Sequence, residues 1–143
     1  MVEFSLRAAT QADLLPMMAI GHEGLRPHIE AYKSWDQAAE EAGFRAHFVP
    51  ELIEIVEVED QAVGYIKVET RHDHVYVDGV YLAHSHRGLG IGSQLLRNLM
   101  KRSHAQGLPV RLRVLRTNPA QHLYLRLGFE AVAETTDAIV MQA

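Results

Sequence analysis

Three alternating glycines lie in the segment Arg87–Ser93, between a strand-like run and a helical pattern. Val75–Leu82 before it is rich in residues that favour strands, and the leucines after it, from Leu95 to Leu99, have helical spacing. Glycines let backbone N–H groups converge without obstruction by Cβ atoms, and a helix N-terminus carries about half a positive charge. The segment therefore predicts an α/β fold with a site for phosphate or pyrophosphate at this turn.

Two better-known phosphate motifs do not match this turn. A dinucleotide fingerprint needs G-x-G-x-x-G, but Ser93 or Leu95 stands where its third glycine would be. The acid expected about 20 residues later, for a ribose hydroxyl, is also missing. A P-loop needs Lys followed by Ser or Thr after its last glycine, and Ser93-Gln94 does not supply it.

The charge distribution agrees with an anionic ligand at the turn. The chain has 14 Lys and Arg against 18 Asp and Glu, a net charge of −4, but no acid occurs from Gly79 through Phe129. All 8 basic residues of the C-terminal half lie in that acid-free span. A basic surface of this kind favours an anionic ligand, although a solvated basic face is an equally good interpretation of the charge alone.

Patterns along the rest of the chain predict a mixed α/β fold. Strands are expected at 3–8, 52–58, 62–69, 75–82, 110–114, 129–133 and 138–141, and helices from Thr10 to about Ile20, from Ser34 to about Phe48, at 92–106 and at 119–127. The region 21–33 contains two glycines and Pro27 and is expected to be irregular. The resulting order, β-α-α-β-β-β-α-β-α-β-β, is an α/β (α+β mixed sheet) layer fold.

Length and composition bound the class of protein. A chain of 143 residues with 48% apolar and 22% charged residues is expected to form a single domain, residues 1–143, with its own core. No apolar run approaches the ~20 residues of a membrane span, and the first residues lack the features of a signal peptide. The absence of cysteine fits a cytoplasmic location and excludes disulfides and a covalent acyl-cysteine intermediate. A net acidic chain is a poor general nucleic-acid binder, so neither nucleic acid nor a membrane is an expected partner.

The turn and a second segment together resemble the GCN5-related N-acetyltransferases (the GNAT superfamily). Arg87, Gly90 and Gly92 match that family's R-x-x-G-x-G signature. Downstream, Asn118 and the run Ala120–Phe129 are similar to its second signature, an Asn followed by A-x-x-L-Y-x-x-x-G-F. The resemblance covers roughly 75–129, and the two signatures are separated by a helix and a strand, as in the family. It implies a GNAT fold with splayed central parallel strands.

The resemblance implies acetyl-CoA as cosubstrate. Backbone groups at the end of the strand before the turn would pair with the pantetheine arm, and N–H groups of the turn would hold the pyrophosphate. Asn118 and Tyr124 would complete the cofactor-binding set. By number, that set is Val80, Tyr81, Leu82, Arg87, Gly88, Leu89, Gly90, Ile91, Gly92, Ser93, Asn118 and Tyr124.

The same resemblance implies direct acyl transfer to an amine. Tyr124 stands where the family places the general acid, and the backbone N–H of Leu82 is the expected oxyanion donor. The general base stays open, because Arg113 occupies the position of a glutamate found in some relatives. Glu69, Asp78, His72, His74 or a water chain are the candidates. The pairs His72-x-His74 and His84-x-His86 lack a third ligand of clear spacing, so no metal site is expected.

The acceptor is not identified by the sequence. The family's acceptor side corresponds to residues of the irregular region and its neighbours, notably His22, Glu23, Arg26, Tyr32 and Trp35, and a helix-start anchor is the better interpretation of Trp35. The partners implied are a small-molecule or peptide amine. Dimerisation is common in the superfamily, but nothing in this sequence demonstrates a homodimer. A non-catalytic acyl-CoA-binding module, acting as sensor or regulatory subunit, is the alternative.

Overall fold

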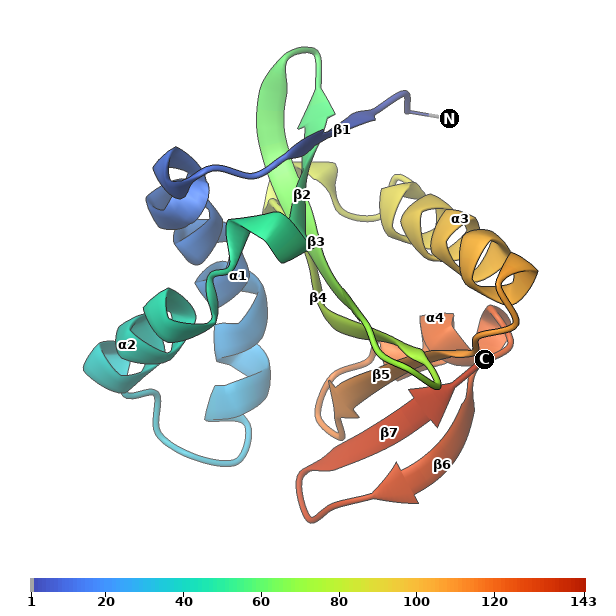
Figure 1. The fold of residues 1–143 in the computed structure, drawn as a ribbon. Coiled ribbons are helices and arrows are strands. Elements are labelled where there is room, and N and C mark those ends of the chain that lie inside the picture. The colour runs from blue at the N-terminus through green and yellow to red at the C-terminus, as the bar shows by residue number, and fades with distance from the viewer. Residues whose placement is uncertain (1) are drawn as a thin grey trace. The chain divides into compact units, whose positions relative to one another are not determined.

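The computed structural model describes residues 2–143, which form a mixed α/β fold (Figure 1). Seven strands follow the sheet order β1-β2-β3-β4-β5-β7-β6. The strands are β1 Ser5–Ala8, β2 Ile53–Val58, β3 Gln61–Thr70, β4 Val75–Leu82, β5 Val110–Leu115, β6 Glu130–Glu134 and β7 Ala138–Gln142. The helices are α1 Leu14–Glu30, α2 Gln37–His47, α3 Ile91–Ala105 and α4 Gln121–Arg126, with 3-10 turns η1 Gln11–Asp13, η2 Pro50–Leu52 and η3 His84–His86. The predicted order of elements is confirmed.

Local chemistry explains several of the element boundaries. The β2–β3 hairpin turns at Glu59 and Asp60, both with positive φ (50° and 64°), as a type I′ turn requires. The sequence predicts a helix from Ser34, whereas α2 begins at Gln37; its cap is Asp36, whose side chain accepts the Ala39 N–H at 3.1 Å. Gly107, with a φ of 74°, follows the C-terminus of α3, where a left-handed glycine commonly ends a helix.

The prediction of an irregular region at 21–33 is wrong, because α1 continues to Glu30. Its glycines are packing positions rather than breaks. A Cβ atom on Gly21 would lie 2.6 Å from the Tyr65 hydroxyl, and one on Gly24 would lie 3.2 Å from the Tyr81 ring. Glycine lowers the stability of a helix, but at these two positions its lack of a side chain lets α1 pack closely against Tyr65 and Tyr81. In the sequence these glycines resemble turn signals, because the tyrosines that pack against them are distant in the chain.

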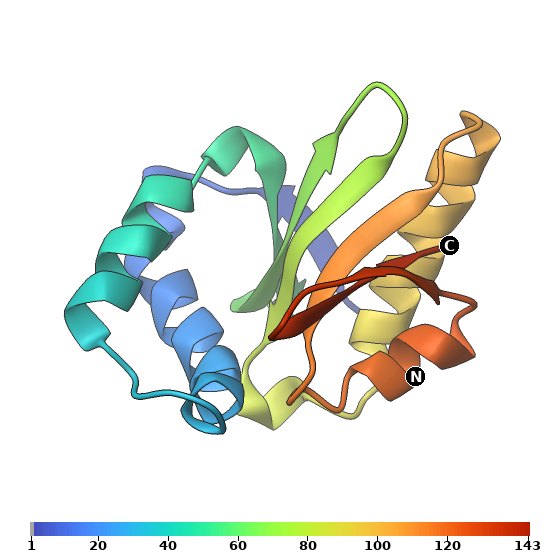
Figure 2. The same cartoon turned by 90° about the horizontal axis from the view of Figure 1, so that it is seen from below.

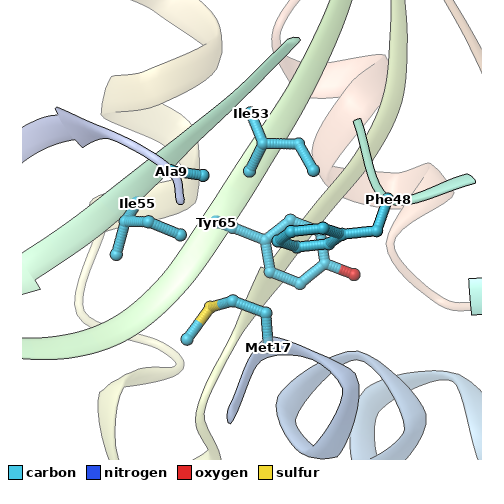
Figure 3. Close-up of a cluster of buried hydrophobic side chains, with 6 residues drawn as sticks. All are labelled: Ala9, Met17, Phe48, Ile53, Ile55 and Tyr65. Atoms are coloured by element: carbon cyan, nitrogen blue, oxygen red, sulfur yellow. The ribbon is translucent and has the colours of Figure 1, made fainter. Parts of the chain in front are cut away.

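The chain divides into two compact bodies, and the division falls inside β3 and β4. The first body comprises residues up to Lys67 together with Gly79–Ile91. Its core contains Met17 of α1, Ile53 and Ile55 of β2 and Tyr65 of β3, with Ala9 and Phe48 beside them (Figure 3). Burying apolar side chains of this size stabilises a fold by about 1.5–3 kcal/mol each. This core fixes α1 against β2 and β3.

The second body comprises Val68–Asp78 and Gly92–Ala143. Its strand β5 pairs in parallel with the start of β4 and antiparallel with β7, which in turn pairs with β6. Leu112 and Val114 of β5 and Met141 of β7 are buried, and α3 and α4 lie on the same side of β5 (Figure 2). The alternation of buried and exposed residues along β5 is that of a sheet with one covered face.

Candidate active site

The glycine turn joins η3 to α3 and contains two left-handed residues. Gly88 and Gly90 have φ values of 72° and 87°, which side chains with a Cβ atom rarely adopt. Gly92 has no such constraint, and a Cβ atom there would meet nothing within 4 Å. Neither backbone strain nor packing within the chain explains Gly92.

Polar contacts fix the segment that leads into the turn. The Arg87 guanidinium donates from Nε to the Leu82 carbonyl at 2.9 Å and from Nη2 to Glu23 Oε1 at 3.2 Å. Glu23 Oε1 also accepts the backbone N–H of His84 at 3.2 Å. The predicted cofactor residues Val80, Tyr81 and Leu82 are half-buried at the end of β4, and Leu89 is exposed. Arg87 therefore acts as a clamp on the chain, in addition to supplying charge.

The parallel ladder between β4 and β5 consists of three residue pairs, from Val75 with Val110 to Val77 with Leu112. Strand β4 continues beyond it to Leu82, and β5 continues to Leu115. On its other edge, β5 stays paired with β7 as far as Leu115 with Ala138. The parallel ladder therefore covers only the first three residues of β4.

Asn118 lies in the turn between β5 and α4. Its Oδ1 accepts the backbone N–H of Ala120 at 2.9 Å, and its carbonyl accepts the Gln121 side chain at 3.1 Å. The contact to the N–H two residues on is an Asx turn, which shapes the backbone just before α4; the N-cap of α4 itself is Ala120. Pro119 precedes the helix without a loss of hydrogen bonds, since proline needs no N–H donor there.

Tyr124 is held by the way in which α4 ends. Gly128 has a φ of 100°; its N–H donates to the Leu125 carbonyl at 3.1 Å, and the Phe129 N–H donates to the Tyr124 carbonyl at 3.0 Å. This pair of bonds is a Schellman motif. The Phe129 ring is only 1% exposed and lies 5.9 Å, centroid to centroid, from the Tyr124 ring. The Gly-Phe end of the second signature is therefore an anchor for the tyrosine.

Burial raises the pKa of the Tyr124 phenol above its ordinary value. A desolvated phenolate is disfavoured, so the hydroxyl stays protonated well above neutral pH. The group is thus a proton donor throughout the physiological range. That protonation state is the one a general acid needs.

The candidate bases Glu69 and Asp78 both lie on the second body, around Tyr76. Burial and the Asp78 charge raise the pKa of the Tyr76 phenol, whereas Arg113 and Arg71 act in the opposite direction. Glu69 pairs with Arg71 at 3.5 Å, and the Arg71 guanidinium lies 4.6 Å above the Tyr76 ring. These residues form one polar cluster, and the sequence does not indicate it because Tyr76 belongs to no motif.

The histidine candidates differ sharply in exposure. The His72 side chain is 94% exposed, whereas that of His74 is 7% exposed and its Nδ1 lies 2.7 Å from Asp73 Oδ1. Among residues 2–143, no group of three His, Cys, Asp or Glu side chains has the geometry to hold a metal ion. Over the same residues, no helix is both long and apolar enough to cross a membrane.

The suggested acceptor residues lie on α1 and just after it. Trp35 Nε1 donates to Gln37 Oε1 at 2.7 Å, which suits the expected anchor at the start of α2. His22 lies edge-on to the Trp35 ring at 5.2 Å, and Arg26 lies 5.6 Å from the same ring. Tyr32 is 40% exposed. Glu23 instead directs its carboxylate to the segment before the glycine turn, a contact between residues 61 and 64 positions apart that no local pattern indicates.

Comparisons with known proteins agree with these signatures. The model of the acetyltransferase (GNAT) family matches residues 17–129. No curated protein matches the sequence. Among solved structures, PaiA N-acetyltransferase from Thermoplasma acidophilum, in complex with coenzyme A, is 17% identical with a TM-score of 0.79, over 99% of this chain and 98% of that one.

Two further neighbours are named for protein or peptide substrates. The ribosomal-protein-S18-alanine N-acetyltransferase from Escherichia coli is 19% identical with a TM-score of 0.72, over 98% of this chain and 92% of that one. Arabidopsis thaliana Naa50, in complex with the bisubstrate analogue CoA-Ac-MVNAL, is 21% identical with a TM-score of 0.67, over 99% of both chains. At these identities the structural likeness establishes the fold. With the family model matching most of the chain, the protein belongs to the GNAT family and is an acetyltransferase.

Proposed function

We propose that this enzyme transfers an acetyl group from acetyl-CoA directly to a primary amine. Acetyl-CoA supplies an activated acetyl thioester when bound. The observation that carries the proposal is the turn Gly88–Gly92, in which two left-handed glycines lead into α3 and a third lacks any structural reason to be glycine. Backbone N–H groups at such a helix start suit a pyrophosphate. PaiA and Naa50, which have the same fold, were solved with coenzyme A or a CoA analogue.

In this proposal the glycine turn and the end of β4 bind the cosubstrate, and Leu82 and Tyr124 assist the transfer. N–H groups of the glycine turn hold the pyrophosphate, and the backbone of Val80–Leu82 aligns the pantetheine arm as an added strand would. The Leu82 N–H stabilises negative charge that develops on the acetyl oxygen. The neutral amine attacks the acetyl carbonyl, so that a C–N bond forms and the C–S bond breaks, and Tyr124 gives its phenolic proton to the departing sulfur. The proton that the acylated nitrogen then loses restores the Tyr124 hydroxyl, directly or through a water. All of this can proceed without a covalent enzyme intermediate, which the absence of cysteine already disfavours.

The general base is assigned to the polar cluster around Tyr76. Glu69 and Asp78 are both candidates: the Glu69 carboxylate pairs with Arg71 at 3.5 Å, and the Asp78 charge acts on the Tyr76 phenol. The carboxylate would accept a proton from the ammonium form of the acceptor, either directly or through a water. The whole chain, residues 1–143, acts as one acetyltransferase domain in this proposal, which the family match over residues 17–129 supports.

The proposed reaction requires a primary amine as acceptor, and a screen of amines can identify which compound it is. A panel of polyamines, amino acids, aminoglycosides and peptides with a free N-terminus is incubated with acetyl-CoA, and release of the free thiol is followed. At least one primary amine should give turnover, and the same compound with an acetylated amine should give none. A chain that binds acetyl-CoA but releases no thiol with any of these classes would overturn the proposal in favour of a binding module, which nothing in the fold favours.

A further inference from the structure

The segment between β4 and the glycine turn is fastened to α1 by one carboxylate. Glu23 Oε1 accepts both the backbone N–H of His84 and the Arg87 guanidinium, each at 3.2 Å. The Arg87 Nε–H in turn donates a hydrogen bond to the Leu82 carbonyl at 2.9 Å. A single side chain on α1 thus contacts this segment at two points, one on its backbone and one through Arg87.

The peptide unit at the end of β4 is held from both sides. Its carbonyl, on Leu82, accepts from Arg87, and its N–H, on Ala83, donates to the Val63 carbonyl of β3 at 2.7 Å. A peptide group fixed at both its polar atoms has one orientation, and the neighbouring backbone groups of Leu82 follow it. The Leu82 backbone is where the proposed function places the oxyanion donor.

The sequence of α1 makes this attachment sterically feasible. A Cβ atom on Gly24, next to Glu23, would lie 3.4 Å from Arg87 Nη2 and 3.2 Å from Cδ1 of Tyr81. Contacts at 3.2 Å are tighter than most Cβ atoms tolerate. Gly24 therefore lets α1 come close enough for Glu23 to reach the segment.

We infer that Glu23 is a positioning residue for the cosubstrate turn: it orients Arg87 and, through it, the end of β4 and the glycines that follow. The inference rests on the proposed function, in which Gly88–Gly92 hold the pyrophosphate. It differs from a purely electrostatic role for Glu23, because a carboxylate near a polyanion site lowers affinity through its charge. The two roles make opposite predictions for removal of the side chain.

The experiment measures the dissociation constant of coenzyme A and the KM for acetyl-CoA in wild type, Glu23→Ala, Glu23→Gln and Glu54→Ala. Glu54, on β2, is an exposed carboxylate of the same body and serves as the matched control. Both partners of the Glu23–Arg87 pair are more than one-third exposed, so the expected effect is modest. Glu23→Ala should weaken coenzyme A binding about three- to tenfold, raise the KM for acetyl-CoA similarly and leave the unfolding midpoint close to wild type.

Glu23→Gln separates the hydrogen bonds of the side chain from its negative charge. Its amide oxygen can still accept from His84 and Arg87, so it should restore most of the affinity, and Glu54→Ala should match wild type. A second test uses Arg87→Ala: because Glu23 acts largely through Arg87, adding Glu23→Ala to that variant should cost less than it does alone. Tighter binding in both Glu23 variants, or full additivity with Arg87→Ala, would overturn the inference. If the wild-type chain itself does not bind coenzyme A, the proposed function fails instead.

Discussion

Gly64, in the middle of β3, is a position where substitution by alanine should strongly destabilise the fold. A Cβ atom there would lie 2.3 Å from the Tyr81 carbonyl oxygen and 2.7 Å from Cδ2 of Leu82. The nearest atom belongs to the backbone of β4 and cannot move away by rotating about a side-chain bond. Gly64→Ala must therefore shift the end of β4, where the cosubstrate backbone contacts are proposed.

The size of the effect follows from that clash. An ordinary contact begins near 3.4 Å, so one strand must move by about 1 Å, and overpacking of this kind costs about 1–3 kcal/mol. Because the obstacle is backbone, we expect about 2–3 kcal/mol in the free energy of unfolding. For a chain of this size that corresponds to a midpoint lower by about 6–12 °C.

Thermal unfolding followed by circular dichroism measures this loss, with Gly43→Ala as the matched control. Gly43 lies within α2, and a Cβ atom there meets nothing within 4 Å. The control should therefore gain about 0.5–1 kcal/mol from helix propensity. Equal midpoints for Gly64→Ala and wild type would refute the packing argument, and a destabilised Gly43→Ala would refute the comparison of glycines on which it depends.

Three further predictions test the site and its supports. Tyr124→Phe should lower kcat by about 10²–10⁴-fold with little change in coenzyme A affinity, and an unchanged kcat with chemistry rate-limiting would remove Tyr124 from the acid role. Gly128→Ala should cost about 1–2 kcal/mol in denaturant unfolding, because the φ of 100° disfavours a Cβ atom; no loss would mean that the Schellman end is unimportant. Arg7 donates to both carboxylate oxygens of Asp13 at 2.9 Å and lowers the pKa of that carboxyl. Its contribution is therefore present above an unfolded pKa of about 3.9 and lost as pH falls below it. Asp13→Asn should lower stability at pH 7 by about 1–3 kcal/mol and flatten the acid side of the stability curve between pH 4 and pH 2, which denaturant titrations can measure; an unchanged acid slope would contradict this.

Local chemistry explains which parts of the fold the sequence predicts well. The hairpin at Glu59-Asp60, the cap at Asp36 and the helix end at Gly107 each depend on a few neighbouring residues, and the element bounds that the sequence predicts around them lie within three positions of the observed ones. The glycine turn belongs with them, because its meaning lies in seven consecutive residues. Such features need no knowledge of the tertiary structure.

Long-range packing accounts for what the sequence does not predict. Gly21 and Gly24 look like breaks in α1 until Tyr65 and Tyr81 are found against them. Glu23 looks like an acceptor-side carboxylate until its bonds to His84 and Arg87 are seen. In both cases the partner is at least 40 residues away along the chain, where periodicity and turn signals carry no information.

Binding of acetyl-CoA to the wild-type chain tests the central claim most directly. Thermal unfolding is followed with increasing acetyl-CoA, with acetate and free adenine as controls. A ligand that binds only the folded state adds about 2.7 kcal/mol at 100 times its dissociation constant, so the midpoint should rise by about 8–11 °C. A rise of this order with acetyl-CoA, absent with the controls, is the result that the glycine turn predicts. An unchanged midpoint at millimolar acetyl-CoA would contradict it.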